Sequence, residues 1–295
     1  MVAKKIFAYT YIYLILLFLY LPVLYLIVFS FTEATYAGQW AGWSWNLYPR
    51  LFQDKEIMTA LGNTLIIAAI SSLLSTLIGT LGAIGVFYCK KGVRHFIEGL
   101  NQINVVNAEI VIAMSLTVMF VFVGQHFFGS NSIFSFWTLL IGHCCLSVPF
   151  VYLNVKPKIQ QMDPALYEAA LDLGSSPNQA IRKVIIPQII PGIMAALLLS
   201  FTLSLDDFIV TAFTRGSGLL SGGSQIETLS TLVQSKIKKG AVPPELRALT
   251  TIIFLIVLTI VIIYSIRVNS KSKGKRSFGK SHAERRIGFN ANPLN

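Results

Sequence analysis

Long runs of hydrophobic residues, separated by short polar segments, dominate the sequence. The runs cover residues 6–31, 60–88, 103–123, 134–155, 187–213 and 248–266. Each is long enough for a transmembrane helix, which needs about 20 residues, and too long for a barrel strand of about 9–11 alternating residues. The pattern therefore predicts an all-α polytopic membrane protein with six transmembrane helices, in a domain that spans 6–266.

The composition also indicates a membrane protein. Of the 295 residues, 54% are hydrophobic and 13% are charged, whereas a soluble domain carries about 25% charged residues. So few charges exclude a disordered chain, a fibrous protein and an ordinary cytosolic enzyme. The first run exceeds the apolar core of a signal peptide, which has about 7–15 residues. We therefore expect an uncleaved first span behind a short cytoplasmic N-terminus, residues 1–5.

The distribution of Lys and Arg predicts the orientation in the membrane. With both termini in the cytoplasm, 17 of the 24 basic residues lie on the cytoplasmic side, where such residues collect in membrane proteins. This topology makes 156–186 a cytoplasmic loop, 214–247 an external loop and 267–295 a basic cytoplasmic tail. The external loop is the exception, because it contains five basic residues. The net charge of +11 thus reports orientation and contact of the tail with lipid, and does not indicate nucleic acid.

Small residues recur at every fourth position of the second run: Ser71, Ser75, Gly79 and Ala83. They form one ridge along a helix, which lets a second helix approach closely. The residues alone leave two interpretations open, packing within the chain and contact with another subunit.

Residues 162–187, in the cytoplasmic loop, have the features of two consecutive helices. Asp163-Pro164 supplies a cap and a first helical residue, and Ser176-Pro177 repeats this start. Gly174 is typical of the position just after a helix end. The first helix carries a narrow apolar face of four residues, Leu166, Ala169, Ala170 and Leu173. A helix this short is unstable alone in water, so we expect the face to be covered by the protein's own helices or by a partner's groove.

The same segment resembles the EAA motif of ABC importer permeases. The resemblance consists of Glu168-Ala169-Ala170, Gly174 after three residues, and Val184-Ile185-Ile186-Pro187 after nine more. Val184 and Ile186 depart conservatively from the family's Ile and Leu. In that family the motif helix couples the permease to a cytoplasmic ATPase. The resemblance therefore assigns this coupling to six residues, Glu168, Ala169, Ala170, Leu173, Gly174 and Pro187.

The resemblance also implies the rest of an importer. It predicts the type I ABC importer permease fold in a bacterial inner (plasma) membrane. The implied partners are a second, similar permease subunit, two ATP-binding subunits, an external substrate-binding protein and membrane lipid. The chain is then a transport subunit and no enzyme, and it binds no cofactor itself, because ATP and Mg belong to the partner ATPase.

Further stretches resemble the C-type permeases of spermidine/putrescine importers, namely 203–210 and 243–251. The resemblance extends from residue 11 to about 266 and implies a polyamine as substrate. Iron(III), thiamine and a phosphonate stay open as alternatives for the same type of permease. One departure lies at Ala108, where these permeases usually carry a proline. Ala108 predicts an unbroken helix at this point.

Three acidic residues lie within or at the edge of the hydrophobic runs: Glu109, Asp206 and Asp207. A charge at membrane depth costs about 2.5–3.5 kcal/mol on insertion scales and usually marks a substrate path or an ion pair. All three suit a cationic substrate and are our candidates for the substrate path. Adjacent helical residues point about 100° apart. One of the two aspartates can therefore face the path, while the other pairs with a base or caps a broken helix.

Other motifs indicate neither catalysis nor a metal site. Residues 274–281 match the phosphate-loop pattern without the preceding strand that such a loop needs, so we interpret the match as a coincidence. His143-Cys144-Cys145 has no second cluster of metal ligands. The aromatic residues of the first external loop, Trp40, Trp43, Trp45 and Tyr48, predict an interfacial belt or a docking surface for the binding protein. A six-span membrane enzyme or sensor is the alternative from another class, but the sequence offers no signal for its site or output domain.

Overall fold

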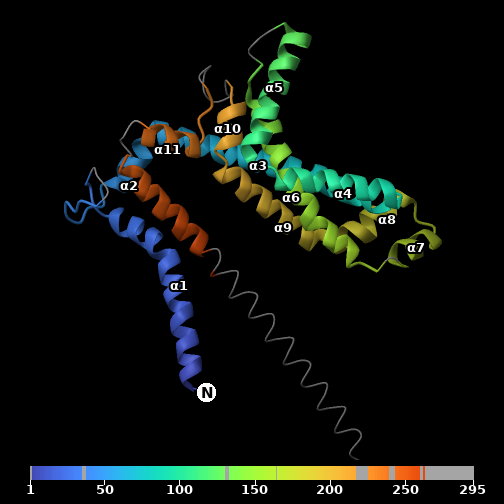
Figure 1. The fold of residues 1–295 in the computed structure, drawn as a ribbon, viewed down its shortest axis with the longest axis horizontal. Helices are drawn as coiled ribbons and strands as arrows, with labels where there is room; N and C mark the ends of the chain where they lie inside the picture. Colours follow the sequence, from blue (N-terminus) through green and yellow to red (C-terminus); the bar gives the residue numbers. More distant parts are fainter. Residues whose placement is uncertain are drawn as a thin grey trace, which may run out of the picture. The chain divides into compact units, whose positions relative to one another are not determined.

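The computed structural model describes residues 2–34, 38–129, 133–163, 165–216, 225–238, 243–259 and 262, which form helices and connecting loops (Figure 1). The chain divides into two compact units, one formed by 1–53 and 242–295 and the other by 54–241. Within the described residues, five helices are long and apolar enough to cross a membrane: Tyr9–Phe29, Lys55–Tyr88, Glu109–Phe128, Phe136–Gln160 and Pro177–Asp206. The all-α prediction is confirmed.

The sixth predicted span, 248–266, lies partly outside the described residues. Residues 245–259 are helical, and of the rest of the span only residue 262 is described. The predicted tail 267–295, which contains the phosphate-loop match, also lies outside the described residues. The helix at 245–259 is consistent with the start of a sixth span.

In the first unit, α1 (Val2–Phe29) is followed by a loop and by the short α2 (Leu47–Gln53). None of the side chains in the apolar stretch of α1 is buried. The helix at 245–259 is attached to the loop, because Nη1 of Arg247 donates a hydrogen bond to the carbonyl oxygen of Ala34 at 3.0 Å.

A carboxylate organises the loop between α1 and α2. Glu33 accepts hydrogen bonds from Ser44 and Asn46 and forms an ion pair of 3.4 Å with Arg50. The two hydrogen bonds, and then the charge of Arg50, hold the pKa of Glu33 below its ordinary value. These contacts therefore tie the described parts of the loop, 30–34 and 38–46, to each other and to α2.

The aromatic side chains of this loop cluster around Phe31. The ring centroids of Trp43 and Trp45 lie 6.0 and 4.8 Å from that of Phe31. Both tryptophans nevertheless remain exposed, at 75% and 70%. Their role as an interfacial belt or as a docking surface stays a prediction.

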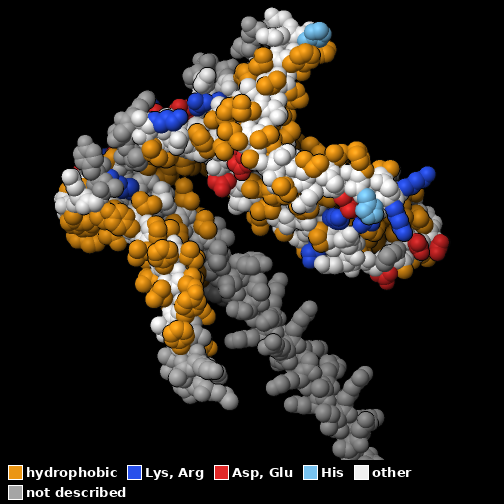
Figure 2. All heavy atoms as spheres, in the orientation of Figure 1, with side chains coloured by type: hydrophobic (Ala, Val, Ile, Leu, Met, Phe, Trp, Pro, Cys, Tyr) orange, Lys and Arg blue, Asp and Glu red, His pale blue; other side chains and the backbone are white. Residues whose placement is uncertain are grey.

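The core of the second unit is a bundle of three helices, α3 (Lys55–Tyr88), α6 (Phe136–Gln160) and α9 (Ile186–Asp206), which pack against one another. The small-residue ridge of α3 is buried in this bundle, which settles its two interpretations in favour of packing within the chain. The outer surface of the bundle is mostly hydrophobic in Figure 2, while charged side chains gather near α7 and the start of α4.

The third predicted span is divided into α4 (Lys91–Val106) and α5 (Glu109–Phe128). Between the two helices the chain is extended, with ψ of 143° at Asn107 and 137° at Ala108. The expectation of an unbroken helix at Ala108 is therefore wrong. In Figure 1, α5 leaves this point in a direction different from that of α4.

Contacts with α6 explain this break. Pro149 has no backbone N–H, so the carbonyl oxygen of Cys145, four residues earlier, loses its helical partner. Nδ2 of Asn104 in α4 donates to that oxygen at 3.3 Å, and Nδ2 of Asn101 donates to the carbonyl oxygen of Pro149 at 3.4 Å. The contacts hold α4 along α6 and override the high intrinsic preference of Ala108 for helix, since tertiary contacts routinely outweigh propensity.

The 162–187 segment contains the two predicted helices, α7 (Ala165–Asp172) and α8 (Pro177–Ala180). A π-helical turn, η1 (Ile181–Ile185), joins α8 to α9, and across it the N–H of Ile186 donates to the carbonyl oxygen of Ile181. The segment is thus continuous with the fifth span.

The fifth predicted span, 187–213, is broken before its end. Helix α9 stops at Asp206, and the short α10 (Ile209–Thr214) begins two residues after Asp207. In the loop predicted to be external, α11 (Leu229–Lys238) is attached to α3, because the N–H of Leu229 donates to Oγ1 of Thr64 at 2.8 Å.

Candidate functional site

The break between α9 and α10 is organised by the carboxylate of Asp207. Its Oδ1 accepts a hydrogen bond from the N–H of Val210 at 3.2 Å, and its Oδ2 accepts from the N–H of Thr211 at 2.8 Å. The hydroxyl of Thr211 also donates to Oδ2, at 2.9 Å. Asp207 thus supplies acceptors for the otherwise unpaired N–H groups that begin α10. The sequence predicts that one of the two aspartates either pairs with a base or caps a broken helix. Asp207 caps the broken helix.

A histidine in the middle of α6 faces the same carboxylate. His143 and Asp207 both have side chains only 1% exposed, and Nε2 of His143 lies 3.7 Å from Oδ2 of Asp207. The imidazole bridges two hydroxyls: Nδ1 lies 2.8 Å from Oγ of Ser204, and Nε2 lies 3.0 Å from Oγ1 of Thr211. Ser71 of α3 extends this contact, because its hydroxyl donates to Oγ of Ser204 at 2.9 Å.

These five residues, Ser71, Ser204, His143, Thr211 and Asp207, form what we call the His143 network. It joins α3, α9, α6 and α10 through one connected set of hydrogen bonds. We interpreted His143 from the sequence only as a failed metal ligand and missed this role. The sequence did offer a signal for it, because His143 is a polar residue in the middle of a hydrophobic run. Burying such a side chain in a membrane span is unfavourable unless it has hydrogen-bond partners.

The other two acidic candidates remain accessible. Asp206 ends α9 and Glu109 begins α5, and both are exposed, whereas Asp207 is buried. The charge of Glu109 interacts with those of Asp206 and Asp207, so the structure brings all three predicted acids into one neighbourhood. Acidic side chains are visible at the surface where α9 ends (Figure 2). Of the three predicted acids, Asp206 and Glu109 are thus the two with exposed side chains.

The ends of α7 have the predicted capping geometry. Oδ1 of Asp163 accepts from the N–H of Ala165 at 3.0 Å. At the other end Gly174 has a φ of +84°, the N–H of Ser175 donates to the carbonyl oxygen of Ala170 at 3.0 Å, and the N–H of Gly174 donates to that of Leu171 at 2.9 Å. This pair of bonds is a Schellman motif, which explains the glycine.

The apolar face of α7 is largely uncovered in the chain. Ala170 is buried, and Tyr167 contacts Tyr88 of α3 with ring centroids 5.0 Å apart. Leu166 and Leu173, by contrast, are 39% and 88% exposed. Ala169 is exposed as well, as are the remaining predicted coupling residues, Glu168, Gly174 and Pro187. The sequence left open whether the protein's own helices or a partner would cover this face. The protein's own helices bury only Ala170 of its four residues.

A cluster of charges ties α4 to α6. The carboxylate of Glu98 pairs with Nζ of Lys156 at 2.8 Å and with Nε of Arg94 at 3.0 Å. The hydrogen bond from Lys156, followed by that from Arg94, holds the pKa of Glu98 below its ordinary value. Arg94 also lies over the ring of Phe87 at 5.6 Å. The cluster fixes the start of α4 near the end of α3.

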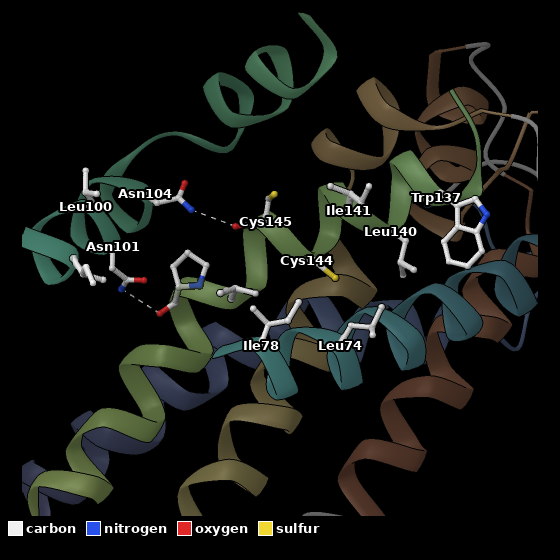
Figure 3. Close-up of a pocket in the computed structure, with 13 residues that line it drawn as sticks. Leu74, Ile78, Leu100, Asn101, Asn104, Trp137, Leu140, Ile141, Cys144 and Cys145 are labelled. Carbon is white, nitrogen blue, oxygen red and sulfur yellow. Dashed lines mark hydrogen bonds between the residues drawn. The ribbon is translucent and has the colours of Figure 1, made fainter. Parts of the chain in front are cut away.

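A hollow of about 680 Å³ lies between α3, α4 and α6 (Figure 3). Its walls are apolar, with Leu74, Ile78 and Ile141 among the side chains that point into it. The two polar residues in the wall, Asn101 and Asn104, already donate to carbonyl oxygens of α6. The hollow contains no charged residue and therefore does not suit a cation.

Within the described part of the chain, no group of three or more His, Cys, Asp or Glu residues has the arrangement of a metal site. The pair Cys144 and Cys145, next to His143, packs as free cysteines in α6. The residues that stand out are instead the acids at the α9–α10 break and the exposed helix α7.

A bundle of membrane-length helices with a polar break in one span and an exposed surface helix is the architecture of a membrane permease. A family model described as "Binding-protein-dependent transport system inner membrane component" matches residues 75–273. The chain belongs to this family, the permeases of ABC importers in the bacterial inner membrane, so the resemblance of the 162–187 segment is confirmed.

Individual relatives extend the match over most of the chain. The chain is 32% identical over 269 residues to the spermidine/putrescine transport system permease protein PotC of Escherichia coli (strain K12), covering 91% of this chain and 93% of that protein. It is 32% identical over 237 residues to the putrescine transport system permease protein PotI of the same strain, covering 79% and 80%.

A solved structure has the same fold. A chain of a bacterial ABC transporter involved in the import of the acidic polysaccharide alginate matches with a TM-score of 0.67 and 19% identity, over 89% of this chain and 93% of that chain. The predicted type I importer permease fold is confirmed. Because that transporter imports an acidic substrate, the fold leaves the choice of substrate open.

Proposed function

We propose that this chain is a transmembrane permease subunit of an ATP-driven importer that takes up polyamines, spermidine or putrescine, delivered by an external binding protein. The observation that carries the proposal is the 32% identity to PotC over 91% of the chain. The name of this relative, like that of PotI, specifies polyamine transport.

The accessible acids at the break support a cationic substrate. Asp206 and Glu109 present carboxylates at the end of one membrane helix and the start of another. A polyamine carries several ammonium groups, each of which can pair with a carboxylate. Asp207 belongs to the proposed path by position, although its oxygens are occupied by α10.

The exposed face of α7 supports the proposed coupling to an ATPase. We assign the contact to Glu168, Ala169, Ala170, Leu173, Gly174 and Pro187. Except for Ala170, which holds α7 on the chain, these residues are exposed. The complete importer would contain a second permease of the same family, two ATP-binding subunits that bind ATP and Mg, and the binding protein, embedded in membrane lipid.

The proposed orientation has both termini in the cytoplasm. The basic residues of the external loop argue against it less than their number suggests. Lys236 pairs with Glu56 at 2.6 Å, which raises the pKa of Lys236, and Arg215 lies 3.9 Å from Glu227. Acidic partners thus offset two of the five positive charges.

Reconstitution of the complete importer in liposomes tests the proposal. ATPase activity is measured with the binding protein and each of spermidine, putrescine, iron(III), thiamine and a phosphonate. Stimulation by a polyamine, accompanied by uptake of the labelled compound, is the expected result. Stimulation by one of the others alone would keep the permease and replace the substrate. Failure of the chain to co-purify with any ATPase would contradict the importer assignment and leave the membrane enzyme or sensor.

A further inference from the structure

The two adjacent aspartates at the α9–α10 break lie in opposite environments. Asp207 is buried, and both of its carboxylate oxygens accept hydrogen bonds from α10. Asp206, one residue earlier, is exposed. The direction in which Asp206 points therefore depends on how Asp207 is held, since Asp206 is the last residue of α9 and Asp207 is the extended residue that follows it.

Asp207 is held from two further sides. Its carbonyl oxygen accepts a hydrogen bond from the hydroxyl of Ser230 at 2.7 Å, which connects the break to α11. Its carboxylate faces His143 across the bundle, with Nε2 and Oδ2 separated by 3.7 Å. A buried carboxylate is stable only when such donors surround it.

The His143 network has one consistent set of donors and acceptors. The hydroxyl of Ser71 donates to Ser204, and the hydroxyl of Thr211 donates to Asp207. With Oγ of Ser204 donating to Nδ1, the imidazole carries its hydrogen on Nε2 and donates to Oγ1 of Thr211. Every hydroxyl and both ring nitrogens are then satisfied, and the network ends on the carboxylate.

The backbone around His143 is adapted to this contact. Gly142 precedes the histidine, and a Cβ atom there would lie 2.7 Å from Cγ1 of Val210. The absence of a side chain lets α10 approach α6 closely enough for Thr211 to reach the imidazole. Thr138, one turn earlier, adds a hydrogen bond of 3.0 Å from its hydroxyl to the carbonyl oxygen of Thr214.

We propose that His143 is a positioning residue for transport: through Thr211 and Asp207 it fixes the α9–α10 break, so that Asp207 serves as the cap of α10 and Asp206 is the aspartate presented to the substrate. The inference rests on the proposed transport function and deepens it. It separates the adjacent aspartates into one that shapes the path and one that meets the cation.

Two amide substitutions of His143 provide a matched test. The amide of Gln reaches the position of Nε2 and can still donate toward Thr211 and Asp207, whereas the shorter amide of Asn replaces Nδ1 and keeps only the contact with Ser204. We expect H143Q to keep KM for uptake within about twofold of the wild type, and H143N to raise it roughly tenfold, as a lost buried hydrogen bond implies. Both variants keep a polar group of similar size, and co-purification of the other subunits measures assembly.

A double-substitution cycle separates positioning from a general loss of stability. If His143 acts by orienting Asp206, the KM of the combined variant H143N/D206N will not exceed that of the worse single variant. A merely structural role would lower the amount of assembled complex and leave KM per complex unchanged. Equal KM values for H143Q and H143N, or KM effects of H143N and D206N that multiply, would overturn the inference.

The outcome can be told apart from a failure of the proposed function. If spermidine and putrescine do not stimulate the wild-type importer, the polyamine assignment fails before any variant is made. The His143 variants are then measured with whichever compound of the panel does stimulate it. The comparison of H143Q with H143N decides the role of His143 in either case.

Discussion

A Cβ atom on Gly79 would lie 2.6 Å from Cγ1 of Val151. Real Cβ atoms do not come this close to a neighbour, so α3 and α6 touch here only because position 79 has no side chain. Another glycine of α3, three residues later, has free space around it. A Cβ atom on Gly82 would meet no atom within 4 Å.

The first prediction compares these two glycines. Gly79→Val should force α3 away from α6 and lower the stability of the second unit by about 1–3 kcal/mol, as overpacked cores do. Gly82→Val adds the same side chain in open space and should have little effect. Thermal unfolding of the detergent-solubilised protein measures both. Equal melting temperatures for the two variants would contradict the described contact.

The second prediction concerns the exposed face of α7. Ala169→Asp places a charge on the proposed ATPase contact without disturbing the chain, because Ala169 is exposed. Uptake should be abolished, while membrane insertion stays intact. Gly174→Asp should act similarly, because an L-residue is strained at a φ of +84° and the helix end would shift.

Asn178→Asp is the matched control for these variants. It adds one negative charge at an exposed position of α8, near a helix start that tolerates acids, and should leave uptake nearly unchanged. ATPase activity and uptake are measured on the same complexes. Normal uptake with Ala169→Asp would remove α7 from the coupling contact.

The third prediction concerns the charge of Asp206. Asp206→Asn keeps the size of the side chain and removes its charge, so polyamine uptake should fall, with KM raised roughly tenfold, because a charge-assisted hydrogen bond is lost. Assembly of the complex should be normal, since Asp206 is exposed. Radiolabelled uptake measures KM. Kinetics identical to the wild type would exclude Asp206 from the substrate path.

The fourth prediction is a pH dependence of stability. Glu98 lies in α4, before the third predicted span, and Lys156 and Arg94 lower its pKa from 4.5. A carboxyl whose pKa is lower in the folded state stabilises the fold above its unfolded pKa. This contribution is lost as the pH falls through the lowered value. Thermal unfolding between neutral and acidic pH should show this loss in the wild type.

Glu98→Gln tests the assignment. The variant cannot titrate, so it should be less stable than the wild type at neutral pH and differ from it less at low pH. Partial exposure of the carboxylate keeps the effect small. An unchanged difference between the two proteins across this pH range would show that the cluster does not stabilise the fold.

The fifth prediction uses a native cysteine to test orientation. Cys89 is exposed at the end of α3, whereas Cys144 is buried. A membrane-impermeant maleimide should label Cys89 in inside-out vesicles and not in intact cells. Gln53→Cys, at the end of α2 and just before the start of α3, in a Cys89→Ser background should show the opposite pattern. Labelling of Cys89 from outside would reverse the proposed topology.

Features that depend on neighbours in the sequence were predicted well. The left-handed Gly174 and the helix start at Ser176-Pro177 follow from residues within one helical turn. The same holds for the ridge that contains Gly79, because its four-residue period is a property of one helix. In these cases the local chemistry determines the local structure.

The two breaks depend on residues far apart in the chain. The break at Ala108 lies beside a hydrogen bond from Asn104 to Cys145, 41 residues away. The break at Asp207 involves His143, whose interaction with Thr211 spans 68 residues. A single sequence gives no measure of such distances, so helix preference at Ala108 was a misleading guide and His143 was overlooked.

The π-helical turn η1 has a consequence for the path of the chain between α7 and α9. A π-turn holds one residue more than an α-turn, and in this chain it lies between α7 and the fifth span. Deleting one residue from Ile181–Ile185 would convert the π-turn to an ordinary α-turn and leave the rotation between its two sides nearly unchanged, because each turn completes one revolution of the helix. The π-turn therefore absorbs the extra residue locally, and the residues on either side keep the facing that an uninterrupted α-helix would give them.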